Sequence, residues 1–436
     1  MFGMRPRSGG SYWGEFLSTG GSLRAGRLTF FGGGFSQTGG TNIIDVMVVP
    51  ERAYNARGSY GLGGGTLVSG SLSFGTWYDA LSYPSSPNPG SFGQGGGIHT
   101  NGSMTLNGDF QYQRHVGKTG IFRYGTYQQS GGLLVSSNVY VKGGSFSQSG
   151  GTNLADTLTI HQSGNFLLRG GELITSNVVV DSQRCEWNAN SRRCFHTSFS
   201  HQEGTHVVQG SLEVKQFASY SLDAGGLTAR NIFIGQNGTL SCKNGGVTNS
   251  GTFTLRGGVF EAGNGKHQLG QLEVLEFGYP SYDGPEHPGS LDLSGSEGGV
   301  VRFRDSRDVQ WSAAKLKLTG WHGWDGKGTR FFIGTDASGL TEAQLSKVAF
   351  VNPLGWGKGE YPARIRNTGE IVPAVAPPLT IAKDPPGVIL SWPGEYDLFR
   401  ATNVAGPFLK VENATKSATN LFNAPQQYFQ LRSREQ

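Results

Sequence analysis

The sequence predicts an all-β protein built on a right-handed parallel β-helix, and three observations support this. The segment Gly144–Asn153 occurs almost unchanged as Gly34–Asn42. Aromatic residues recur with a period near 20, since Tyr127 to Phe146 is 19 residues and Phe146 to Phe166 is 20. The 71 glycines follow no Gly-X-Y period, and glycine supplies the positive φ of tight turns. A fixed period of this length is typical of a solenoid.

A leucine-rich repeat is the competing interpretation of this period. It requires a regular leucine framework and usually a helical segment, whereas leucines are sparse here and glycines interrupt every helical window. A parallel β-helix requires short strands joined by permissive turns, and segments such as Asn177–Val180 and Asn231–Ile234 suit those strands. We therefore expect aromatic side chains to stack inside, Gln and Asn to form ladders along the axis, and the crossovers to be right-handed.

Composition excludes several classes of protein. Aromatic residues make up 11% of the chain and the formal net charge is only +5, a balance that predicts folding rather than disorder. The basic residues are scattered, with no run longer than Arg192-Arg193, so we expect no nucleic-acid partner. No apolar run approaches the roughly 20 residues of a membrane helix. We therefore expect no membrane-spanning segment.

The repeats predict a β-helix domain over residues 10–278. Two segments interrupt the repeats, at residues 75–97 and 182–198, and we interpret both as loop insertions. Loops on solenoids often carry binding residues, although long loops are also tolerated at small entropic cost.

Composition changes after residue 279. Residues 290–373 are rich in aromatic residues and predict a β-rich capping domain, with a short helix over Leu340–Lys347. A cap would cover strand edges and apolar side chains at the end of a solenoid. A proline-rich linker over 374–378 then leads to residues 379–436, whose short alternating segments predict a small C-terminal β-sandwich.

Residues 10–373 resemble bacterial exported proteins of the PEP-CTERM and autotransporter-associated β-helix repeat families. The residues that carry the resemblance are the glycine-rich repeats together with Phe332–Thr335, Gly339–Thr341, Gln344-Leu345, Phe350–Pro353 and Gly369–Pro373. The resemblance implies a secreted or surface-attached protein and no particular catalytic residues. Such proteins often end in a Pro-Glu-Pro motif, an apolar helix and basic residues. This chain instead has a module containing Trp392 and Tyr428, which looks like a terminal domain of secreted bacterial proteins.

Exposed aromatic side chains are the candidates for glycan contacts, because their rings can stack on sugars. The candidates are Trp77, Tyr78, Tyr83, Trp324 and Trp356. The first three belong to the predicted loop at 75–97. For Trp324, as for Trp321, a place in the core of the capping domain is the alternative.

Cys185 and Cys194 lie in the second insertion near His196, His201 and His206. Cysteine and histidine together can hold zinc, but a Cys-x8-Cys spacing matches no standard zinc pattern. A disulfide between the two cysteines is the simpler interpretation and would contribute about 2–3 kcal/mol, with two free thiols or a metal site as the alternatives. We therefore expect this disulfide and neither a metal nor a cofactor.

Many β-helices degrade polysaccharides, and hydrolysis of the pectin type needs paired carboxylates on adjacent strands. The spacings of Asp156, Asp181, Glu213, Asp223 and Glu261 do not fit one position on successive coils. No Asp-Asp pair or nucleophile-elbow motif is present. We assign no catalytic residue, and the sequence favours a noncatalytic protein.

The sequence therefore predicts a secreted or cell-surface protein with a structural or adhesive function. The expected partners are extracellular polysaccharide, the cell envelope or, end to end, further copies of the chain. The first residues, Met1–Arg7, lack the apolar core of a signal peptide, so we expect a leader to be missing. The alternatives are a carbohydrate-active β-helix enzyme and a self-assembling extracellular fibre subunit.

Overall fold

The chain forms two compact units, Met1–Gly258 and Val259–Gln436. A computed structural model of the chain describes residues 15–30, 33–49, 58–74, 90–107, 125–182, 185–188, 191–194, 196–276, 288–295, 298–312, 314–322, 328–384, 387–392, 396–414, 417–421 and 426–433.

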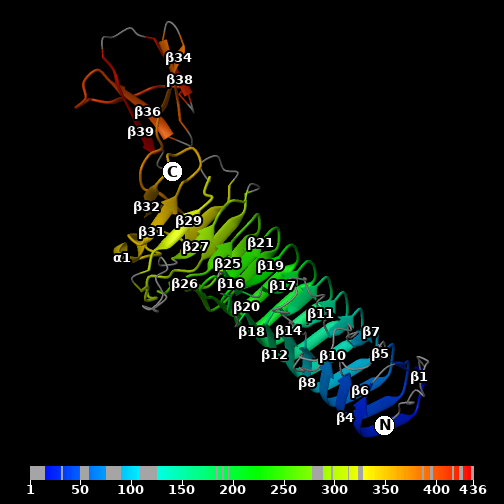
Figure 1. Cartoon of the computed structure of the whole chain (residues 1–436). Helices are drawn as coiled ribbons and strands as arrows, with labels where there is room; N and C mark the ends of the chain where they lie inside the picture. The colour runs from blue at the N-terminus through cyan, green and yellow to red at the C-terminus, as the bar shows by residue number, and fades with distance from the viewer. Residues whose placement is uncertain are drawn as a thin grey trace. The chain divides into compact units, whose positions relative to one another are not determined.

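The first unit consists of repeated coils, each with one short and one long strand (Figure 1). The short strands pair in the order β1 (Glu15–Ser18), β3 (Gly33–Gln37), β5 (Gly58–Leu62), β7 (Ser91–Gln94), β9 (Thr126–Gln129), β11 (Ser145–Gln148), β13 (Asn165–Leu168), β17 (Thr197–His201), β19 (Ala218–Leu222) and β21 (Thr239–Cys242). The long strands pair in the order β2 (Ser22–Thr29), β4 (Thr41–Val49), β6 (Thr66–Phe74), β8 (Ile98–Asn107), β10 (Leu133–Lys142), β12 (Thr152–His161), β14 (Glu172–Asp181), β18 (Thr205–Val214), β20 (Gly226–Ile234) and β22 (Gly246–Asn249), with β23 (Thr252–Leu255) also beside β20. Neighbouring strands of successive coils are parallel, which confirms the predicted parallel β-helix.

A column of stacked aromatic rings fills the interior, as the period predicts. Phe146 pairs in register with Tyr127 on one side and Phe166 on the other. Neighbouring ring centroids along the column lie 4.4–5.0 Å apart over Phe16, Phe35, Tyr60, Phe92, Tyr127, Phe146, Phe166, Phe199 and Tyr220. Such ring pairs contribute about 0.5–1.5 kcal/mol each beyond their buried area.

The long strands from β2 through β20 turn a corner, which gives a coil three outward faces. In β12, Asn153 and Ala155 point inward before the corner, and Leu158 and Ile160 point inward after it. Between them Asp156 and Thr157 both face outward, so the alternation of a single strand is interrupted there. The apolar residues on either side of the corner therefore reach the same interior.

Glycine pairs close the turns between short and long strands because larger residues do not fit. Gly151 has φ +75°, and a Cβ atom added there would lie 2.5 Å from the carbonyl oxygen of Gly132 in the preceding coil. Gly132 itself has φ +72° and the same relation to Gly97. This close approach explains why the Gly-Gly pair repeats with the period of the coil.

Interior glutamines connect successive coils, although differently from the expected ladders. The Nε2 atoms donate to backbone carbonyls of the next coil, at 2.9–3.0 Å, in the pairs Gln37–Thr66, Gln94–Leu133, Gln129–Thr152 and Gln148–Glu172. The expectation that side-chain amides bond to one another along the axis is therefore wrong for these glutamines, whose amides bond to the backbone instead. These bonds satisfy carbonyl groups at the start of the long strands.

Both predicted insertions are shorter than expected. Residues 91–94 form β7, and Phe92 belongs to the aromatic column. Residues 197–198 likewise begin β17. Between β14 and β17, β15 (Cys185–Asn188) and β16 (Ser191–Cys194) form an antiparallel hairpin. Phe92 and Phe199, rather than the density of glycine, mark the positions of these two short strands.

The second unit begins with further parallel strands. One set pairs in the order β24 (Val259–Glu261), β27 (Gly289–Asp292), β29 (Leu316–Thr319) and β31 (Val348–Val351), and the other in the order β25 (Lys266–Leu269), β28 (Val300–Phe303) and β30 (Arg330–Ile333). β26 (Gln271–Val274) follows β25 in the chain. Pairing becomes antiparallel at β32 (Glu360–Ile365) and β33 (Ile371–Pro373). The helix expected over Leu340–Lys347 is one turn, α1 (Glu342–Leu345), with a capping box between Thr341 and Gln344.

Two small antiparallel sheets complete the second unit. One has the order β34 (Thr380–Asp384), β35 (Gly387–Ser391) and β38 (Ser417–Leu421), and the other β37 (Leu409–Lys410), β36 (Tyr396–Ala401) and β39 (Tyr428–Ser433). Residues from both sheets share one core, formed by Leu390, Trp392, Leu398, Ala414 and Leu431. This arrangement is that of a small sandwich, as the sequence predicts.

Candidate functional site

The outward side of the short-strand sheet carries rows of hydroxyl groups. We call this surface the hydroxyl face; it consists of Ser36, Ser59, Ser91, Thr126, Ser145, Ser147, Ser198, Ser200, Ser219, Ser221, Thr239 and Ser241. All twelve are partly exposed, because their neighbours in each strand point into the core. One row runs in register through Ser59, Ser91, Thr126 and Ser145.

The hydroxyl face is a regular and uncharged surface. Strands lie about 4.8 Å apart, and alternate residues of one strand lie about 6.6 Å apart, so the side chains form a grid. Among the described short strands from β3 through β21 that form this sheet, no outward position carries a charged residue. Within the described residues, Ser198 donates to Asn165 at 3.1 Å and Ser219 lies 3.0 Å from His196, while the other hydroxyls of the face have no protein partner. They can therefore bond to a ligand.

Two of the histidines near the second insertion, His201 and His206, lie in the interior of the coils. His201 and His206 are both 0% exposed, and their Nδ1 atoms lie 3.1 and 2.9 Å from the Tyr220 hydroxyl. Burial lowers the pKa of both imidazoles, and the neighbouring His201 lowers that of His206 further. Among the described residues, no group of three or more His, Cys, Asp and Glu side chains is placed to hold a metal ion.

The hairpin places the two cysteines opposite each other. Cys185 and Cys194 are Cα partners in the β15–β16 pair. Directly opposed residues in antiparallel strands have Cα atoms about 4.5–5.5 Å apart, within the range of disulfides. Their side chains lie outside the described part of the structure, so the disulfide stays a prediction. Cys242 is a separate thiol, 3% exposed, in β21.

Most glycan-contact candidates lie outside the described residues: Trp77, Tyr78, Tyr83 and Trp324. Trp356 is described and is 9% exposed. Its ring packs edge-on against Trp321 and Tyr361, with centroids 6.3 and 5.3 Å away. Little of this ring is available for stacking on a sugar, although its buried Nε1 finds no hydrogen-bond partner in the described part of the chain.

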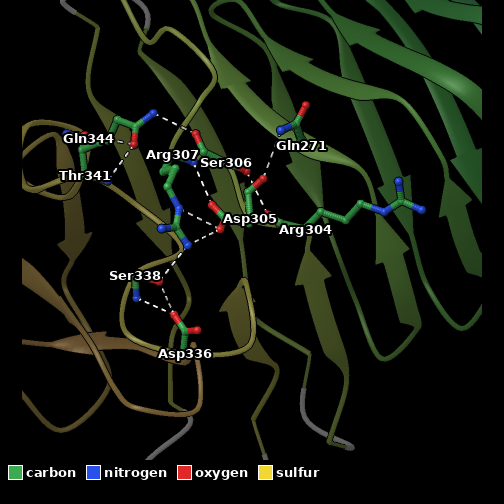
Figure 2. Close-up of polar contacts among 9 residues, drawn as sticks. All are labelled: Gln271, Arg304, Asp305, Ser306, Arg307, Asp336, Ser338, Thr341 and Gln344. Atoms are coloured by element: carbon green, nitrogen blue, oxygen red, sulfur yellow. Dashed lines mark hydrogen bonds and ion pairs between the residues drawn. The ribbon is translucent and has the colours of Figure 1, made fainter.

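A pair of carboxylates in the second unit tests the enzyme alternative (Figure 2). Arg307 donates through Nε to Asp305 Oδ2 at 2.8 Å and through Nη2 to Ser338 Oγ at 2.7 Å. The Ser338 hydroxyl and the Ser338 amide both donate to Asp336 Oδ1, the amide at 2.7 Å. These bonds, from Arg307 to Asp305 and from Ser338 to Asp336, hold the pKa of both carboxyls below the usual range. A glycosidase needs one carboxyl with a raised pKa as its general acid, so this pair does not fit that chemistry.

No helix in the described residues has the length and apolar character needed to cross a membrane. Comparisons with protein-family models, curated proteins and solved structures found no match to this chain. The resemblance to exported β-helix repeat families therefore stays a prediction.

Proposed function

We propose that this chain is a noncatalytic structural or adhesive protein of the cell surface or extracellular space, and that its hydroxyl face contacts glycans. The observation that carries the proposal is the in-register array of uncharged hydroxyls. One hydrogen bond contributes only about 0.5–1.5 kcal/mol net. Many equivalent bonds to a repeating ligand can act together, because formation of the first raises the effective concentration for the next.

The chemistry of the described residues supports a noncatalytic protein over a carbohydrate-active enzyme. The interior histidines and tyrosines have no contact with solvent. The carboxylates of Asp305 and Asp336 are both held ionised and are bound to protein donors. General acid catalysis requires a proton donor that reaches the substrate, and neither group supplies one.

Sedimentation of the full chain with insoluble cellulose, chitin and β-1,3-glucan tests the proposal. We expect binding to at least one polymer, and loss of that binding in the variant S147K/S200K, whose lysines disrupt the hydroxyl face. The matched control T157K/T159K adds the same charge on another face of the helix and should bind normally. Equal binding by both variants would refute the assignment of the surface, and time-dependent release of reducing sugar would favour the enzyme.

Self-assembly is a second candidate, favoured by the side chains of β1. Phe16 and Leu17 are 43% and 61% exposed, whereas the rings further along the column are buried. Within the described residues β1 is the last strand of its sheet, and an edge strand with exposed apolar residues can pair with another chain. If the protein assembles through β1, its mass in solution should rise with concentration in the native chain and fall in the variant F16D. Concentration-independent mass would exclude this function.

A further inference from the structure

An arginine cluster lies on the outward side of β28 and β30. Val301 and Phe331 are fully buried, so the alternate residues Arg302, Arg330 and Phe332 project from the opposite side of the sheet. Arg302 and Phe332 are direct register partners. The guanidinium carbons of Arg302 and Arg330 lie 4.2 and 4.8 Å from the centroid of the Phe332 ring.

Glu370 orients two guanidinium groups of this cluster. The residue bridges to Phe332, on strand β30. Arg330 Nε donates to Glu370 Oε1 and Arg366 Nη1 donates to Oε2, both at 2.8 Å. The Glu370 side chain is 6% exposed, whereas those of Arg330 and Arg366 are 45% and 39% exposed. The carboxylate is therefore covered while the arginines it positions remain accessible.

The arrangement leaves positive charge and donors for a ligand. Arg302, Arg330 and Arg366 carry three positive charges, and Glu370 neutralises one of them. A guanidinium has five N–H donors in a rigid plane. Arg330 and Arg366 use one donor each for Glu370, and we find no ion pair for Arg302 among the described residues. The remaining donors match the two oxygens of a carboxylate or sulfate.

Basic residues extend across several strands, which favours a polymer over a small anion. Lys266 on β25 is in register with Val300 on β28, and Val300 with Arg330 on β30. Lys266 is exposed and lies in the same outward row as Arg330. The step from β25 across β28 and β30 to Glu370 covers about 14 Å, at about 4.8 Å a strand. Several anionic groups of one chain can be bound over that distance.

We propose that the arginine cluster, formed by Arg302, Arg330 and Arg366 around Phe332 and Glu370, binds the carboxylate or sulfate groups of an acidic polysaccharide. This deepens the proposed glycan-contact function, on which it rests, but uses a surface separate from the hydroxyl face. A nucleic acid is less suited, because Phe332 is only 4% exposed and offers no open ring face for a base.

The test measures affinity of the full chain for immobilised polygalacturonate, dextran sulfate, uncharged dextran and single-stranded DNA at two salt concentrations. We expect binding to polygalacturonate or dextran sulfate, and the stronger of the two identifies the anion. The variant R302Q/R330Q should bind about tenfold or more weakly, because charge-assisted bonds are lost. The variant R302K/R330K keeps the charge but lacks the planar fork, and it should lose most of the same affinity.

R307Q is the matched control. It removes one positive charge in the same unit, but Asp305 already neutralises Arg307, so affinity should change by less than about twofold. Melting temperatures identify folded variants, and if R302Q/R330Q does not fold, R302K/R330K decides. The proposal is overturned if neither acidic polymer binds, if R307Q weakens binding as much, if R302K/R330K binds like the native chain, or if DNA binds as tightly. None of these results would contradict the separate proposal that the hydroxyl face binds neutral insoluble glycans.

Discussion

Replacing Phe146 by alanine should be among the most damaging single changes in the β-helix. The Phe146 side chain is 0% exposed, and its ring stacks between Tyr127 at 4.8 Å and Phe166 at 4.6 Å. A core Phe→Ala change costs about 3–5 kcal/mol. Because two ring contacts of about 0.5–1.5 kcal/mol each are lost as well as buried area, we expect a value near the upper end of that range.

Urea unfolding followed by circular dichroism measures this loss, with S147A as the control. Ser147 is the next residue of the same strand but faces outward, so its replacement should change stability by less than about 0.5 kcal/mol. A double-mutant cycle adds specificity to the test. F146A and F166A should couple by about 0.5–1.5 kcal/mol because the rings touch, whereas F146A and F199A, a coil further apart, should be additive within about 0.5 kcal/mol.

Two results would refute this reasoning. The first is a loss of less than about 1 kcal/mol in the free energy of unfolding of F146A, since removal of a fully buried ring should cost more than that. The second is equal coupling of Phe146 to Phe166 and to Phe199. That outcome would show that the column does not transmit stability through neighbouring contacts, as a solenoid should.

Three further predictions concern the same unit. G151A should destabilise the fold by about 1–3 kcal/mol, because a Cβ would meet the Gly132 carbonyl at positive φ, whereas G93A has open space and should be nearly neutral in the same urea assay. Burial lowers the pKa of His99 to about 3, below its unfolded value, so its contribution to stability is present above the unfolded pKa of about 6.5 and is lost as pH falls. Between pH 6.5 and 5 the native chain should lose about 1.6 kcal/mol that H99Q retains. Peptide mass spectrometry without reduction should recover Cys185 linked to Cys194, and alkylation of both thiols in the unreduced protein would contradict the disulfide.

The sequence was sufficient to predict the coil because the interior is periodic. Phe146 and Phe166 recur at the spacing at which side chains of successive coils meet, and the structure confirms that they stack. The period also places Gln148 among the repeated polar residues, but the expected ladder of stacked amides does not form there. Its Nε2 atom instead donates to the Glu172 carbonyl of the next coil at 2.9 Å, and the turn geometry that brings this oxygen close is not visible in the spacing.

The arginine cluster could not be predicted from the sequence. Arg302 and Phe332 are neighbours because β28 and β30 pair in one register. Glu370 lies beside Phe332 through a separate, isolated β-bridge. The intervening segments have no fixed period, so spacing alone does not align these residues. Conversely, His201 and His206 lie near the cysteines in the sequence, and their interior position could not be predicted from that spacing. Alternation along β17 and β18 turns both into the core, where they bond to Tyr220.

Because Tyr127, Phe146 and Phe166 follow one another in register, any of these coils can serve as a template for its neighbour. A tandem duplication of one complete coil would meet matching surfaces above and below, and would lengthen the array of outward serines without disturbing the residues already there. Partial duplications would instead leave a glycine corner facing a bulky side chain. A gene encoding such a chain can thus gain or lose whole coils. Selection can therefore change the length of the outward surface without changing the side chains that each coil presents.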